Sequence, residues 1–197
     1  MDARVTDLIE SVEAGLPVLR ATAVELERME RDEDRLSANA LSAAILRDPL
    51  MTVRVLRYLQ SHRTRSQTAD ITTIAHALMM LGLARFFREF AELPVLEDQP
   101  GLSEKASLYA RAALSRSRLA ALLARDWAGQ RHDLDPEEVM VAALVHDIAE
   151  PLAALRSPAT IEGIAAGNRT SRIIRRWPVP SMRAASIRRG STKRAPR

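Results

Sequence analysis

The amino-acid sequence predicts an all-α fold, and three observations favour it. Apolar residues recur at helical spacing along most of the chain, alternating strand-like runs are few, and proline, serine, threonine or aspartate stands where helices would begin. The hydrophobic content of 47% is enough for a packed core, while aromatic residues make up only 4% of the 197 residues. The core is therefore expected to consist of aliphatic side chains, in one domain or one domain with an appendage.

Composition excludes several classes of protein. The chain has no cysteine, which rules out disulfides and thiolate metal sites. No apolar run approaches the roughly eighteen residues that a membrane span needs, and the N-terminal segment MDARVTDLIE lacks the features of a signal peptide. We therefore expect a soluble cytoplasmic protein.

The first part of the chain predicts three helices. Residues 4–13 have an apolar face, and a second helix is expected to open at Leu16 and to run to about Arg31. A third helix covers residues 36–47, with Ser37 as its N-cap. The charged run at residues 27–35 is interpreted as a solvated helix end and loop.

The stretch from Arg47 to Gly82 predicts two central helices. Pro49 suits the first turn of a helix, where its missing N–H costs nothing. Polar residues 61–70 predict a loop, after which Thr72 or Thr73 caps the next helix. Gly82 ends that helix, because glycine adopts a left-handed backbone readily.

Residues 83–93 predict a further helix that gathers the three phenylalanines of the chain, Phe86, Phe87 and Phe90. We interpret this cluster as a core plug or a seam between two halves, with a partner-binding patch as the alternative. Residues 94–102 contain two prolines and a glycine, and they are typical of a linker.

A long helix is expected from Ser103 to about Gly129. Arg111, Arg118 and Arg125 recur every seven residues and predict a basic stripe on its wet face. The side chains expected to be buried are Leu108, Ala112, Leu119, Leu122, Leu123 and Trp127.

The last predicted helix opens at Asp135 and Pro136 and continues to Pro151. Asp135 is a suitable N-cap, and Glu138 is placed to complete a capping box. This helix carries the adjacent pair His146 and Asp147, the most chemically suggestive element of the sequence.

The segments RDPLMTVRVLR and ITTIAHALMMLGLARF resemble the signature of the HDOD domain, a helical signalling module related to the HD phosphohydrolases. The resemblance begins at the LPVL segment of residues 16–19 and continues to VHDIAEPL at residues 145–152. It implies a multi-helix bundle of two helical halves, here at about residues 1–93 and 103–155. The second, HD-like half is expected to be incomplete.

In HD phosphohydrolases, such a His-Asp pair supplies two metal ligands, and the resemblance implies a further histidine on an earlier helix and a further aspartate on a later one. The helix from Ser103 to Gly129 contains no histidine and has Arg111 or Ser115 in that region. No aspartate follows Asp147. We therefore expect no metal, no cofactor and no catalysis, with His146 and Asp147 as a structural remnant in a buried polar cluster. The alternative is a metal-dependent phosphohydrolase.

Residues 156–197 differ from the rest of the chain. They hold eleven Lys or Arg and one Glu, a net charge of 11 − 1 = +10, whereas the whole chain carries +4. This composition predicts a disordered tail beyond a domain at residues 1–155. Binding of nucleic acid through phosphates, adhesion to an anionic membrane, and an out-of-frame or otherwise nonfunctional extension remain alternatives for it. If the tail is nonfunctional, the domain lacks its last helices. The apolar face that those helices would cover is then exposed and favours self-association.

The resemblance implies a regulatory module of bacterial signal transduction. Such a module would bind a partner protein, or a small ligand in the cleft between its helical halves. The surface that we predict for this binding comprises Arg54, Arg57, His62, Arg63 and Arg65.

Overall fold

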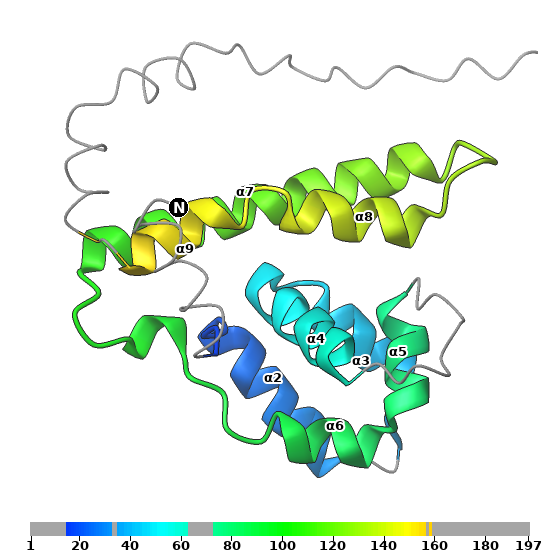
Figure 1. The fold of residues 1–197 in the computed structure, drawn as a ribbon, viewed down its shortest axis with the longest axis horizontal. Coiled ribbons are helices and arrows are strands. Elements are labelled where there is room, and N and C mark those ends of the chain that lie inside the picture. The colour runs from blue at the N-terminus through cyan, green and yellow to red at the C-terminus, as the bar shows by residue number, and fades with distance from the viewer. Residues whose placement is uncertain (1–14, 33–34, 63–72, 157, 159–197) are drawn as a thin grey trace, which may run out of the picture. The chain divides into compact units, whose positions relative to one another are not determined.

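In the computed structural model of the chain, the described residues are 15–32, 35–62, 73–156 and 158, and within these ranges there are helices and no strand. Figure 1 shows helices α2 (Arg20–Arg31), α3 (Ala38–Ile45), α4 (Pro49–Ser61), α5 (Ile74–Leu81), α6 (Leu83–Glu89), α7 (Glu104–Ala128), α8 (Pro136–Val145) and α9 (Ala149–Arg156), and the 3-10 turn η2 comprises Leu96–Asp98. The all-α prediction is confirmed. All described residues belong to one compact unit, Met1–Gly163. The helix predicted at residues 4–13 lies outside the described residues.

Most of the predicted helix starts are confirmed by their caps. The Ser37 hydroxyl accepts a hydrogen bond from the Ala40 N–H, and the Thr73 hydroxyl accepts one from the His76 N–H, each at 3.1 Å. The Asp135 carboxylate accepts from two backbone amides at the start of α8. Between α5 and α6, Gly82 has a φ of +83°, a conformation that side chains other than glycine rarely adopt.

The segment before α2 is extended, so the predicted helix start at Leu16 is wrong. The Val18 N–H donates to the Pro94 carbonyl and the Leu96 N–H donates to the Val18 carbonyl, both at 2.8 Å. This short parallel pairing satisfies backbone groups that a helix would otherwise satisfy. Leu96, which takes part in it through its N–H, has a fully buried side chain. Part of the predicted linker at residues 94–102 is therefore a packed segment.

The two predicted helical halves share their hydrophobic core. Helix α3 packs on α2, α4 and α5, while α8 and α9 pack along α7 (Figure 1). The larger cluster of buried side chains combines Phe86, Phe87 and Phe90 with Met140 and Leu144 of α8, which confirms the prediction that the phenylalanines fill the core. A smaller cluster likewise joins residues of both halves: Leu16, Leu50, Leu96, Ala110, Leu114, Leu152 and Ala154.

The buried face of α7 differs from the predicted one. Leu108, Leu119, Leu123 and Trp127 are all more than half exposed. The residues that the structure buries on α7 are mostly small: Ala106, Ala110, Ala113, Leu114, Ser117, Ala121 and Ala128. Small side chains let α8 and α9 approach α7 closely, because the distance between packed helices depends on the side chains at the contact.

Within the described ranges, no helix is both long enough and apolar enough to cross a lipid bilayer.

Candidate functional site

The His146–Asp147 pair lies in a turn between α8 and α9. The prediction of one continuous helix from Asp135 to Pro151 is therefore wrong. The His146 Nδ1 atom is 2.8 Å from the Asp147 Oδ1 atom, so the two side chains form a hydrogen bond. Their side chains are 79% and 70% exposed. The prediction of a buried polar cluster is therefore wrong, because this pair is solvated.

The residues around this pair do not complete a metal site. In the part of the chain that the structure describes, no three histidine or acidic side chains gather closely enough to hold an ion. A catalytic zinc site commonly uses three protein ligands and leaves one position open. Two exposed donors on neighbouring residues do not meet that requirement.

Asp48, which precedes Pro49, has the opposite environment and is fully buried. One of its carboxylate oxygens accepts from the Leu50 and Met51 amides at the start of α4. The other accepts from the Leu19 amide and the Thr22 hydroxyl at 2.8 and 2.9 Å. Burial raises the pKa of Asp48, and these hydrogen bonds oppose the rise. Asp48 therefore joins α4 to the segment that leads into α2.

Arg54 belongs to the predicted binding surface, and the structure gives it a contact within the fold. Its Nη1 atom donates to the Leu16 carbonyl at 2.7 Å, and the side chain is half-buried. Burial lowers the pKa of Arg54, with a smaller contribution from the nearby positive charge of Arg57. Arg54 thus holds the extended segment before α2.

The other predicted surface residues divide in two. Arg57 is exposed on α4. His62 caps the end of α4: its Nδ1 atom lies 2.8 Å from the Tyr58 carbonyl, and its ring stacks on the Tyr58 ring at a centroid distance of 4.0 Å. Arg63 and Arg65 lie outside the described residues. Of the three described residues, Arg54 contacts the fold, Arg57 is exposed and His62 caps α4, and a binding surface formed by all five residues stays a prediction.

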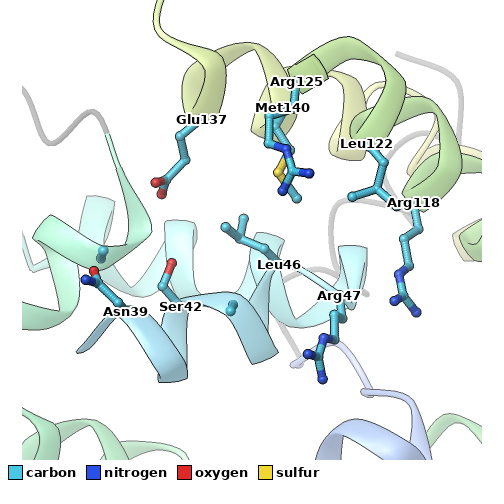
Figure 2. A pocket seen from close by; sticks show the side chains of 11 residues that line it. Asn39, Ser42, Leu46, Arg47, Arg118, Leu122, Arg125, Glu137 and Met140 are labelled. Carbon is cyan, nitrogen blue, oxygen red and sulfur yellow. The ribbon is translucent and has the colours of Figure 1, made fainter. Parts of the chain in front are cut away.

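A pocket of about 400 Å³ lies where the two halves meet, and we call it the interhelical pocket. Figure 2 shows side chains of α7 and α8 on one wall and side chains of α3 and the loop after it on the other. The lining residues that carry polar or charged groups are Asn39, Ser42, Arg47, Arg118, Arg125 and Glu137, and the larger apolar ones are Leu46, Leu122 and Met140.

The charges around the interhelical pocket are unequally compensated. Arg47 forms an ion pair with Glu25 at 3.1 Å, and Arg125 one with Asp126 at 3.3 Å. Arg118 has no carboxylate within ion-pair distance among the described residues.

The single carboxylate of the pocket, that of Glu137, already accepts a hydrogen bond from the Ile74 N–H at 2.8 Å. The lining alone holds three arginines and one glutamate, a net charge of 3 − 1 = +2, which the ion partners Glu25 and Asp126 offset from outside the lining, so that Arg118 is the arginine left without a partner among the described residues. One pattern in the sequence signals the positive charges of this pocket. It is the seven-residue repeat of arginines, from which the sequence alone predicts only a wet face.

Comparison with known proteins agrees with this architecture. The HDOD domain family matches residues 16–177, which extends beyond Leu152, where the resemblance noted in the sequence ends. Comparison with curated proteins gives no match, and none of the solved structures matches the chain. Since the family match covers most of the chain, this protein belongs to the HDOD domain family.

Proposed function

We propose that this protein is a non-catalytic signalling module that binds a small anionic molecule in the interhelical pocket. The observation that carries the proposal is Arg118, which lies at the pocket without a carboxylate partner among the described residues. The pocket volume of about 400 Å³ lies within the range of small-molecule sites.

The lining of the pocket suggests the chemistry of the ligand. Arginine binds phosphate or carboxylate through a planar set of donors, and Asn39 and Ser42 on the facing wall offer further hydrogen bonds. Leu46, Leu122 and Met140 supply apolar contacts. A small molecule with one anionic group and one flat apolar part fits this combination.

The position of the pocket supports a regulatory role. Its walls belong to α3 and α5 of one half and to α7 and α8 of the other. A ligand that contacts both walls favours the arrangement in which they face each other, and so shifts the population of conformations that a partner protein meets.

The proposal of a non-catalytic protein rests on the donors near His146. Among the residues that the structure describes, this histidine bonds to one carboxylate, that of Asp147, whereas metal-dependent hydrolysis needs a fuller ligand set. Metal analysis of the purified protein tests it. Stoichiometric bound metal that disappears in an Asp147→Ala variant would establish the phosphohydrolase alternative.

Titration calorimetry with phenyl phosphate and with AMP tests the ligand proposal. We expect Arg118→Ala to weaken binding about tenfold or more. Arg57→Ala is the matched control, since Arg57 is an exposed arginine outside the pocket. Loss of binding in the Arg57 variant, with Arg118→Ala unaffected, would move the site to the surface first predicted around α4.

A further inference from the structure

The outer face of α7 is an exposed apolar stripe. Its large side chains are Leu108, Leu119, Leu123 and Trp127, with exposed fractions of 61%, 59%, 63% and 55%. Together with the exposed Ala112 they recur at intervals of four or seven residues, so they share one side of the helix. From Leu108 to Trp127 the stripe is about 28 Å long at 1.5 Å per residue.

The stripe lies opposite the face that α7 buries against α8 and α9. The buried positions of α7 include Ala110, Ser117 and Ala121, each about half a turn from a residue of the stripe. Soluble proteins seldom expose a contiguous apolar patch of this kind unless another molecule covers it.

Four of the five residues of the stripe, all except Trp127, are self-complementary about one point of the helix. Leu108 and Leu123 are equally far from the point between Ser115 and Arg116, and so are Ala112 and Leu119. In a two-fold symmetric contact between antiparallel helices, residue i meets residue j and j meets i. Two copies of α7 crossing at this point would therefore set leucine against leucine and each small alanine against a leucine.

The charges that flank the stripe obey the same symmetry. Lys105 and Asp126 lie on the same side of α7, at spacings of three from Leu108 and Leu123, and they too are equally far from the point between Ser115 and Arg116. The ion pair of Asp126 with Arg125 is solvent-exposed on both sides, and such pairs contribute little. An antiparallel pair of α7 helices would place Lys105 of one copy against Asp126 of the other, twice.

Arg116, the charged residue nearest the point between Ser115 and Arg116, also has a partner of opposite charge. Arg116 forms an ion pair with Glu150 of α9 in the same chain, which reduces repulsion between two Arg116 side chains close to the symmetry axis. At the outer end of the stripe, Arg131 lies over the Trp127 ring at 5.4 Å, a cation–π contact.

We propose that two copies of this chain associate through the outer face of α7 as a symmetric antiparallel dimer centred between Ser115 and Arg116. A parallel arrangement would set Lys105 against Lys105, and an unrelated partner would not account for the paired positions within one helix. The two interhelical pockets lie outside this contact, because Arg118 and Arg125 lie on the side of α7 that lines the pocket.

Cross-linking of the full chain tests the register. The protein has no cysteine, so Ser115→Cys introduces a single thiol, and Ser115 is exposed. We expect a short bis-maleimide to link Ser115→Cys into covalent dimers with high yield. The matched control is Lys105→Cys, which should cross-link poorly alone and efficiently when mixed with Asp126→Cys.

Sedimentation equilibrium of the full chain tests the energetics. Leu119→Glu and Leu123→Glu each bury a charge in the contact, and we expect either to weaken dimerisation at least a hundredfold. Lys105→Asp or Asp126→Lys alone should weaken it several-fold, and the double reversal should restore it. Circular dichroism of each variant verifies that its helix content is unchanged.

Three outcomes overturn the proposal. The first is a monomer whose Ser115→Cys thiol reacts slowly with maleimide, because another part of the chain then covers the face. The second is a monomer whose thiol reacts freely, because the face is then left for a different partner. The third is efficient cross-linking of Lys105→Cys alone, which would establish a parallel dimer.

Discussion

The dipeptides Asp48–Pro49 and His146–Asp147 each carry an aspartate at a helix boundary, and the environments of these two aspartates are opposite. Asp48, before Pro49, is fully buried and accepts four hydrogen bonds from two separate segments, the start of α2 and the start of α4. The side chain of Asp147, after His146, is 70% exposed, and its carboxylate bonds only to His146 among the described residues. The first dipeptide joins parts of the fold to one another, and the second occupies a solvated turn.

This difference shows that a chemically reactive residue type does not identify the positions whose contacts hold the fold together. The His-Asp pair has the chemistry of a metal site, yet among the described residues no group outside the pair bonds to either of its side chains. Asp48 is the N-cap of α4, yet it also accepts hydrogen bonds from Leu19 and Thr22, which precede it by more than twenty residues. The comparison can be tested by disturbing each pair in turn.

The largest effect is expected from Asp48→Ala. This change removes the acceptor of three backbone amides and one hydroxyl at a buried position. We expect the free energy of unfolding to fall by about 3 kcal/mol, because buried donors lose their partners. Urea denaturation measures it, and a loss below about 1 kcal/mol would show that water replaces the carboxylate.

A smaller effect is expected from pH. Because burial raises the pKa of Asp48, the folded state retains a proton that the unfolded state has already released. The free energy of unfolding should therefore fall as the pH rises from the pKa of an unfolded aspartate to that of folded Asp48, and then level off. Subtracting the free energy of unfolding of Asp48→Asn from that of the wild-type protein at each pH isolates this contribution. This difference should fall as the pH rises, and a difference that rises with pH would contradict the prediction.

Thr22→Val removes one of the four donors to Asp48 and preserves the shape of the side chain. Thr22 is buried and its hydroxyl lies 2.9 Å from the carboxylate. We expect a loss of about 1 kcal/mol in the free energy of unfolding, again by urea denaturation. A double-mutant cycle with Asp48→Asn should show that the two losses are not additive.

The smallest effect is expected from Asp147→Ala. Its carboxylate is exposed and bonds only to the adjacent imidazole among the residues described, so the free energy of unfolding should change by no more than about 0.5 kcal/mol. The midpoint of thermal unfolding measures this change. A loss comparable to that of Asp48→Ala would mean that the turn between α8 and α9 has a structural role of its own.

Local chemistry made much of the fold predictable. Pro49, Thr73 and Asp135 start helices because each satisfies, or does not need, the free amides of a first turn, and that requirement depends only on nearby residues. Gly82 ends α5 for an equally local reason, its positive φ.

The features of the fold and of the pocket that the sequence did not predict depend on contacts between residues far apart in the chain. Helical periodicity predicts that the largest apolar residues of α7 are buried, whereas the structure buries mostly small residues of α7 against α8 and α9. Similarly, the extended backbone at Val18 depends on Pro94 and Leu96. The interhelical pocket combines residues of four helices, and no single segment of the sequence shows that Arg118 and Ser42 line the same pocket.

The hydrogen bond from the Ile74 N–H to the Glu137 carboxylate has a consequence for the order of folding. It joins the start of α5 to α8 across 63 residues of chain, so the first amide of α5 acquires its acceptor only when α8 has docked. Contacts between such distant residues require closure of a long loop and tend to form late. Exchange of the Ile74 amide with deuterium should therefore report the arrival of α8, while the amides in the middle of α5 report the formation of α5 itself.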